Sequence, residues 1–332
     1  MRIGAVLILW LLPWMVAAQD WEDRQVFGAG DVSLRILSST DTSFFAPIIE
    51  DFLRGRTDVS VEYLVTGTAD LDARFRAAPD GFDVVISSAM DLQLKLANDG
   101  FAAQVSDTGH PAWAKWRDSL FAFTAEPAAI VINRRGLGAL PVPQTRQDMI
   151  ALMRDHSQVF EGRVGTYDVR QSGLGYLFAT QDARASETYW RLIEVMGRMG
   201  AHLYCCSGAM IDDLVSGDLV VAYNVLGSYA EARAEEEDAL LVILPSEFPT
   251  TMMRTVLVSG KTRAPDLADA FVRHVLAVQA SGDAERFPLP SLTAAQRNPT
   301  IISLDPALMT YLDQMKRAIF IREWEDAILQ DG

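Results

Sequence analysis

Apolar strands, short polar turns and helices alternate along the chain. Residues 32–37, 59–65 and 82–86 are apolar runs, and each leads into a Ser- or Thr-rich turn and then a helical stretch. Strands that alternate with helices predict a parallel sheet, whose loops at the strand carboxyl ends lie along one edge. Helix N-termini at that edge offer unpaired N–H groups and hydroxyls add donors, which suits an anionic or heavily hydroxylated small molecule. The alternative is that these Ser and Thr residues only cap helices.

A second series of the same kind follows later in the chain. Each of its strands also ends in a short polar turn that opens a helix. The strands are predicted at residues 163–166, 202–204 and 219–223.

Two long extended stretches, residues 122–133 and 252–259, join the two series. Two α/β series with two crossings predict two lobes with a ligand cleft between them, an architecture that supports hinge closure. We expect one lobe to contain residues 29–122 and 255–332, and the other to contain residues 123–254. The predicted fold is therefore α/β and two-lobed, with two hinge crossings.

The amino terminus is typical of a secretory signal. Residues 1–18 contain Arg2, an apolar stretch and a small-residue ending, and the apolar stretch is too short for a confident membrane span. We expect removal of this segment and a mature protein in an exported aqueous compartment, the bacterial periplasm. A formal net charge of −15 argues against nucleic acid and anionic membranes as partners.

The cysteine content is low and unusual. Cys205 and Cys206 are the two cysteines of the chain, and they are neighbours. Adjacent cysteines close only a strained ring, so no stapling disulfide is expected. With His202 they form a conceivable soft-metal or arsenite site, but they lack a recognised ligand spacing. We interpret them as small, partly buried residues at a strand end.

The sequence contains none of the common catalytic or nucleotide-binding motifs. Gly28-Ala29-Gly30 precedes the first strand instead of following it, so it is no dinucleotide fingerprint. The four histidines fall on different predicted elements. We therefore predict a binding protein without cofactor or metal, with an exported enzyme of unfamiliar type as the alternative.

Four segments carry a resemblance to a known family. Residues 82–88, 165–175, 213–233 and 264–271 resemble the extracellular solute-binding proteins of bacterial ABC importers, in the two-lobed class that includes ferric-iron binders. The resemblance implies a two-lobed fold, a small-molecule ligand and an ABC permease as partner. It also implies two sets of ligand-binding residues: Ser39, Thr40, Thr68 and Ser88 on one wall, and Arg170, Ser172, Gly173, Ser207, Asn224 and Tyr229 on the other.

One departure from the family concerns iron. Ferric binders of this class carry adjacent tyrosines at positions that align with Leu226 and Gly227, which cannot supply phenolate ligands. The region is instead similar to relatives that bind phosphorylated sugars or phosphoglycerate-like acids, including some that report to a membrane histidine kinase.

We therefore predict a monomeric periplasmic receptor that captures a small organic or phosphorylated anion by lobe closure and delivers it to a permease. Arg170 and helix N-termini would grip the anion; the alternative for Arg170 is a surface or lobe-packing residue, and for Tyr229 a core aromatic. A ligand sensor that docks on a histidine kinase is the second hypothesis, and ferric transport is less favoured.

Overall fold

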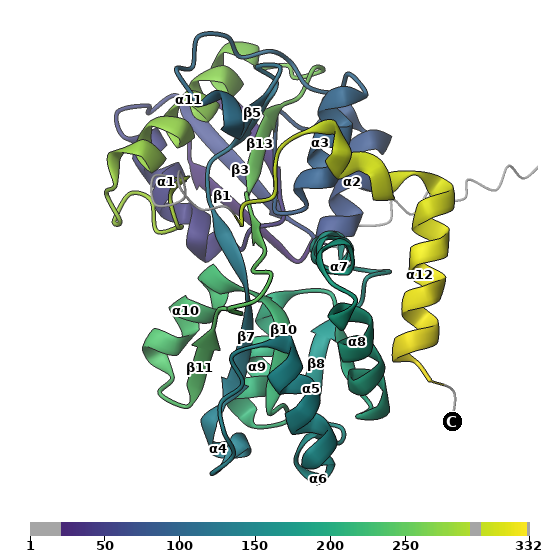
Figure 1. Cartoon of the computed structure of the whole chain (residues 1–332). Helices are drawn as coiled ribbons and strands as arrows, with labels where there is room; N and C mark the ends of the chain where they lie inside the picture. The colour runs from purple at the N-terminus through teal and green to yellow at the C-terminus, as the bar shows by residue number, and fades with distance from the viewer. Residues whose placement is uncertain (1–20, 293–299, 331–332) are drawn as a thin grey trace, which may run out of the picture.

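The computed structural model describes residues 21–292 and 300–330. Two β-sheets, each covered by helices, form the upper and lower halves of the molecule in Figure 1. The predicted signal segment, residues 1–18, lies outside the described residues. Within the described residues no helix is both long enough and apolar enough to cross a lipid bilayer.

The first sheet has a parallel centre with antiparallel strands added on both sides. Its strands are β1 (Asp23–Gly28), β2 (Val32–Ser38), β3 (Val59–Val65), β4 (Val84–Ser87), β5 (Lys115–Trp116), β6 (Leu120–Ala122) and β13 (Thr255–Val258). Their order across the sheet is β1-β3-β2-β4-β13-β6-β5. Strand β2 runs parallel to β3 and β4, so the segments that follow these three strands meet at one edge.

Helices cover both faces of this sheet. They are α1 (Thr42–Leu53), α2 (Thr68–Ala77), η1 (Pro79–Gly81), α3 (Met90–Asn98), η2 (Ala112–Ala114) and α11 (Pro265–Ser281). Because successive side chains of a strand point to opposite faces, Ile36 packs in the cluster that contains Phe52 of α1 and Phe271 of α11. Its neighbour Leu37 packs in the cluster that contains Leu71 of α2 and other apolar residues of α3.

The second sheet has the order β11-β7-β10-β8-β9, with β12 paired to β7. Its strands are β7 (Glu126–Asn133), β8 (Val164–Tyr167), β9 (His202–Tyr204), β10 (Val221–Leu226), β11 (Leu240–Ile243) and β12 (Thr251–Met252). Strand β8 runs parallel to β9 and β10. The segments after β8, β9 and β10 therefore also share one edge, and this edge faces the corresponding edge of the first sheet.

Among the described residues, seven helices lie between the strands of this second half. They are α4 (Arg134–Leu137), α5 (Arg146–Asp155), α6 (Ser157–Phe160), α7 (Gly173–Ala185), α8 (Thr188–Arg198), α9 (Ser207–Ser216) and α10 (Gly227–Glu236). Helix α8 shows why the sequence folds this way: Tyr189, Leu192, Ile193 and Met196 recur at helical spacing and are buried on one face. That face packs in a third apolar cluster, which also contains residues of α5 and β10.

Both expected connections between the halves are present. Strand β7 begins where the chain leaves the first sheet, and the segment from β12 to β13 returns to it. The structure adds a third connection through η4 (Pro306–Leu312) and α12 (Gln314–Ile328). In Figure 1 this yellow segment passes from the upper half down beside α8.

The remaining differences from the sequence predictions have simple causes. Strand β1 was not predicted because five of its six residues are exposed and show no apolar alternation. Helix α12 was assigned with residues 255–332 to the first lobe, and this was wrong: Phe320, Trp324 and Ile328 pack in the core of the second half. The other lobe boundaries stay a prediction.

Candidate functional site

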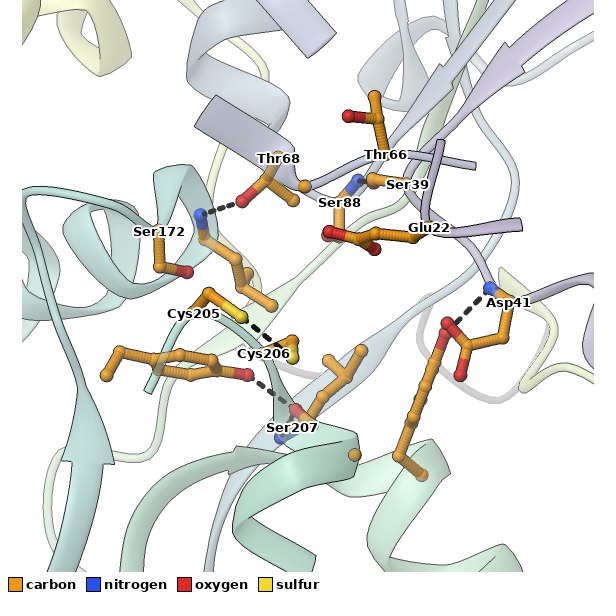
Figure 2. Close-up of a pocket in the computed structure, with 16 residues that line it drawn as sticks. Glu22, Ser39, Asp41, Thr66, Thr68, Ser88, Ser172, Cys205, Cys206 and Ser207 are labelled. Atoms are coloured by element: carbon orange, nitrogen blue, oxygen red, sulfur yellow. Dashed lines mark hydrogen bonds between the residues drawn. The ribbon is translucent and has the colours of Figure 1, made fainter. Parts of the chain in front are cut away.

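A cavity of about 90 Å³ lies between the facing edges of the two sheets. Its walls come from the segments that follow the parallel strands of both halves (Figure 2). The lining residues are Glu22, Ser39, Asp41, Thr66, Gly67, Thr68, Ser88, Tyr167, Ser172, Leu174, Cys205, Cys206, Ser207, Gly208, Leu226 and Tyr229.

Hydroxyl groups shape the wall contributed by the first sheet. Ser39 follows β2, and its Oγ donates to Ser87 Oγ at 3.3 Å and accepts from the Ser88 amide at 3.2 Å. Ser38, the last residue of β2, is held by Tyr63, whose hydroxyl donates to Ser38 Oγ at 2.7 Å. These bonds hold the turns after β2 and β4 side by side, so the hydroxyls of the wall have fixed positions.

The opposite wall is organised around Ser207 at the start of α9. Its Oγ accepts from the Leu226 amide at 3.1 Å and lies 2.5 Å from the Tyr167 hydroxyl. Since Tyr167 ends β8 and Leu226 ends β10, Ser207 links the segments after three neighbouring strands. Ser172 caps α7 by accepting from the Gly175 amide at 3.0 Å.

The two walls touch each other directly. The Leu174 amide of the second half donates to Thr68 Oγ1 of the first at 3.2 Å, and the Asp41 amide donates to the Tyr229 hydroxyl at 3.1 Å. The rings of Phe44 and Tyr229 lie 4.5 Å apart between centroids. The two halves are therefore in direct contact beside the cavity (Figure 2).

Five helices begin at the cavity. The first turn or N-cap of α1, α2, α7, α9 and α10 contributes lining residues, namely Asp41, Thr68, Ser172, Ser207 and Leu226. The first amides of a helix have no partner within the helix, and its dipole places partial positive charge there. No lysine or arginine lines the cavity in the part of the chain that the structure describes. The partial positive charge among the lining groups therefore comes from the backbone.

Two carboxyl groups, Glu22 and Asp41, complete the lining. Burial raises the pKa of Glu22, and the nearby carboxylates of Asp41 and Asp70 raise it further. Burial also raises the pKa of Asp41, against the lowering effect of the Tyr229 hydroxyl and Arg254. Groups of this kind can accept hydrogen bonds from the hydroxyls of a bound molecule, or donate one when protonated.

Six of the ten residues expected to bind ligand line the cavity. They are Ser39, Thr68, Ser88, Ser172, Ser207 and Tyr229. Their binding role stays a prediction.

Three others lie close by but do not line the cavity, which corrects the expectation. Thr40 is fully buried, and its Oγ1 accepts a hydrogen bond from Arg254. Gly173 packs against the other half, where an added Cβ would lie 3.2 Å from the Thr68 carbonyl oxygen. Asn224 forms a bulge in β10 with φ of 65°, and its Nδ2 donates to Asp182 at 2.9 Å.

Arg170 is the largest correction. Its guanidinium makes a double contact with Asp168, at 2.8 Å from Nε and 2.7 Å from Nη2, and Nη1 lies 3.2 Å from Glu325 of α12. The group also lies over the ring of Trp324. Arg170 therefore holds α12 against the turn that follows β8. This packing role is the alternative to ligand binding that the sequence left open for Arg170.

Sequence reasoning missed the acidic lining residues and misjudged the cysteines. Glu22 precedes β1, the strand with no apolar signal, so nothing in the sequence placed it near the site. Asp41 lies in the polar turn after β2, where position alone could have found it. Cys205 and Cys206 were expected to be partly buried at a strand end, but both are exposed and line the cavity.

A buried ion pair lies where the connections cross. Arg254, between β12 and β13, contacts Glu126 at the start of β7 through two bonds of 3.0 Å, and both side chains are fully buried. Thr40 of the first half and Ser228 of the second bond to this pair. Although burial alone would raise the pKa of Glu126, the Arg254 guanidinium holds it below its usual value.

No protein-family model and no curated protein matches the sequence. Solved structures do match it. A substrate-binding protein of an ABC transporter from Agrobacterium tumefaciens is 30% identical, with 92% of this chain and 98% of that chain covered and a TM-score of 0.86. The chain belongs to the family of ABC-transporter substrate-binding proteins. The predicted family and the predicted two-lobed fold are thereby confirmed.

More distant members share the fold. The periplasmic binding protein AfuA from Actinobacillus pleuropneumoniae, solved with fructose-6-phosphate bound, is 17% identical over 91% of this chain and 100% of that chain, with a TM-score of 0.72. Iron-bound HitA from Pseudomonas aeruginosa is 15% identical over 89% and 99%, with a TM-score of 0.66. The same fold therefore occurs in one protein solved with a sugar phosphate and in another solved with iron, so the fold does not identify the ligand of this chain.

Proposed function

We propose that this substrate-binding protein captures a small, hydroxylated organic anion, such as a phosphorylated or carboxylated sugar derivative, in the periplasm and delivers it to an ABC permease. The observation that supports this proposal is the convergence of five helix N-termini on one cavity. Helix N-termini bind phosphate and carboxylate through free amides and the dipole. No side-chain cation is needed for such a site.

The carboxyl groups favour a ligand with hydroxyls as well as an anionic group. Glu22 and Asp41 are acceptors within the same cavity as the helix N-termini. An inorganic oxyanion alone would leave them without a role and would be repelled by them. A molecule with an anionic end and hydroxyl groups at the other end uses both sets.

The cavity disfavours ferric iron. The resemblance aligns Leu226 and Gly227 with the adjacent tyrosines of ferric binders, and neither residue can supply a phenolate ligand. Tyr167 and Tyr229 do line the cavity, but burial raises the pKa of both phenols, which opposes the phenolate form that ferric iron requires. Both hydroxyls are also engaged in hydrogen bonds within the protein.

A ligand screen tests the proposal. Thermal unfolding is measured with fructose-6-phosphate, 3-phosphoglycerate, inorganic phosphate, fructose and ferric citrate, followed by calorimetry on any hit. A ligand that binds only the native state adds about 2.7 kcal/mol of stability at a hundredfold excess over its Kd. We expect stabilisation by a phosphorylated or carboxylated compound and none by fructose. Stabilisation by fructose alone or by ferric citrate alone would reject the proposal.

A pair of serines on α9 localises the site. Ser207→Ala removes a hydroxyl from the cavity wall, and Ser216→Ala removes one from the exposed far end of the same helix. One neutral hydrogen bond contributes about 0.5 to 1.5 kcal/mol, so Ser207→Ala should weaken binding of the best ligand of the screen by roughly two- to tenfold. Equal affinities of both variants would place the ligand elsewhere.

A further inference from the structure

Two thiols face each other in the wall of the cavity. Cys205 follows β9 and Cys206 is the N-cap of α9, and their sulfur atoms lie 3.0 Å apart. Both cysteines are free, exposed and part of the cavity lining. Figure 2 shows the two side chains turned toward one another beside Ser207. Neither thiol has a part in the binding function proposed above.

We propose that Cys205 and Cys206 form a reversible dithiol–disulfide pair, a modification site in the wall of the ligand cavity. The proposal goes beyond the binding function and does not depend on the identity of the ligand. Its basis is the placement of two accessible sulfurs in one cavity, already in contact.

Ring closure requires a small movement and gives a labile bond. The contact of 3.0 Å must shorten to the disulfide length of about 2.0 Å. Adjacent Cα atoms are about 3.8 Å apart across a trans peptide, which is below the usual separation in disulfides. The resulting strain makes the bond easier to reduce, and strained, exposed disulfides are the labile and regulatory ones. This chemistry favours a switch and disfavours a structural staple.

The reaction balances with a small disulfide as the oxidant. The Cys205 thiolate attacks one sulfur of the oxidant and releases its first thiol, which leaves a mixed disulfide on Cys205. Cys206 then loses its proton and attacks the Cys205 sulfur, which releases the second thiol. One disulfide is reduced to two thiols while the two cysteines are oxidised to one disulfide, so oxidation and reduction balance.

Either sulfur can make the first attack. A thiol is nucleophilic as the thiolate, both sulfurs are accessible, and each lies in contact with the other. If Cys206 attacks first and Cys205 resolves the mixed disulfide, the same balanced reaction results.

Oxidation would reshape the wall that holds the ligand. Cys206 immediately precedes Ser207, which bonds to the Leu226 amide and contacts Tyr167. A change of backbone at Cys206 changes the first turn of α9, and with it the amides that this helix presents to the cavity. The redox state of the pair is thereby coupled to the geometry of the site.

Intact-mass spectrometry of the whole protein tests the pair. The reduced protein is incubated with oxidised glutathione, the exchange is quenched with iodoacetamide, and the intact mass of the protein is measured. We expect a monomer that has lost the mass of two hydrogen atoms and accepts no alkylation, and dithiothreitol should restore two alkylations. A product that carries glutathione on both cysteines, a disulfide-linked dimer or an unreacted protein would overturn the proposal.

Single substitutions show that both sulfurs are needed. Cys206→Ser and Cys205→Ser cannot close the ring, so each should accumulate a glutathione adduct on its remaining cysteine. A glutathione adduct that accumulates to the same extent on the wild-type protein would overturn ring closure. Hydrogen exchange on the wild-type protein then compares the oxidised and reduced forms. A change confined to the peptides of β9 and α9 supports the coupling, and identical exchange there overturns it.

Discussion

Asp91 shows how one buried side chain makes stability depend on pH. It lies at the start of α3, is almost completely buried, and its Oδ1 has no hydrogen-bond partner within the described part of the chain. Burial raises the pKa of Asp91 to about 7. The native state therefore holds this proton more tightly than the unfolded chain, in which the pKa lies near 3.8. The stability contributed by the protonated form is present at low pH and is lost as the pH rises from about 4 to 7.

We predict that Asp91→Asn stabilises the protein at pH 8 and has a much smaller effect at pH 4. A shift of one pKa unit corresponds to about 1.4 kcal/mol, so the gain in unfolding free energy at pH 8 should be about 1 to 4 kcal/mol. Chemical denaturation at both pH values measures it. Asp99→Asn at the other end of the same helix is the control, because Lys95 and Arg76 bind that carboxylate and lower its pKa. A gain that is equal at both pH values would show that Asp91 is not the titrating group.

Arg170 illustrates why a charged residue in the right segment can be misassigned. Its neighbourhood of Ser172 and Gly173 fits a ligand-binding turn, but its partners are Asp168, two residues earlier, and Glu325, far along the chain. Because Glu325 is so distant in sequence, no local pattern indicates its contact with Arg170. Ser172 of the same turn does line the cavity, because its position after a parallel strand fixes which edge it occupies.

We predict that Arg170→Ala lowers stability and leaves the cavity intact. The Asp168 carboxylate would lose its double contact, at a cost of about 1 to 3 kcal/mol in unfolding free energy. Calorimetric affinity for the best ligand of the screen should stay within twofold of the wild type at a temperature where the variant is folded. Arg184→Ala, an exposed position on α7, is the matched control for charge. A tenfold loss of affinity in a fully folded Arg170→Ala protein would return this residue to the binding site.

At the scale of elements, the regular strand–turn–helix units could be predicted and the irregular pieces could not. Apolar runs identified β2, β3, β4, β8 and β10, whose residues are largely buried. Strand β1 has a polar, exposed surface, so its pairing with β3 depends on backbone hydrogen bonds that leave no pattern in the side chains. Helix α12 has a recognisable helical sequence, but its apolar positions do not reveal which core they enter. Local pattern thus predicts an element, while its partner depends on the whole chain.

The two connections between the halves, β7 and the β12–β13 segment, are joined by the buried ion pair of Arg254 and Glu126. Arg254→Met leaves the fully buried Glu126 without a counter-charge, and removal of one partner from a buried pair costs about 3 to 5 kcal/mol. We predict this loss in chemical denaturation. The double variant Arg254→Met with Glu126→Gln should recover part of the stability, since no buried charge then remains. A double variant as unstable as the sum of both single variants would mean that the pair has no mutual interaction.

At the scale of the whole molecule, the two halves are joined by hydrogen bonds between the cavity walls and by an apolar cluster that contains residues of both halves. Thr68 Oγ1 accepts the Leu174 amide, and Tyr229 accepts the Asp41 amide. Contacts that exist only in the closed form set the balance between open and closed forms, and the measured affinity falls with the fraction of protein that is competent to bind.

We predict that Thr68→Val shifts this balance toward the open form. Valine keeps the shape of threonine and removes the acceptor, at about 0.5 to 1.5 kcal/mol for one hydrogen bond. Small-angle scattering of the ligand-free variant should show a larger radius of gyration than that of the wild type. Saturating ligand should restore the wild-type value. Ser60→Ala, on β3 away from the cavity, should change neither, and an unchanged radius for Thr68→Val would remove this bond from the closure mechanism.

The packing of α12 on the second half has a practical consequence for sensing. The described chain begins beside β1, in the first sheet, and ends after α12, which is anchored to α8 in the other half (Figure 1). Under the proposed lobe closure, the two ends would belong to halves that change their distance when the ligand binds. A donor fluorophore attached near residue 21 and an acceptor near residue 330 would convert closure into a change of energy transfer, and the labelled protein would become an optical reporter of its own solute.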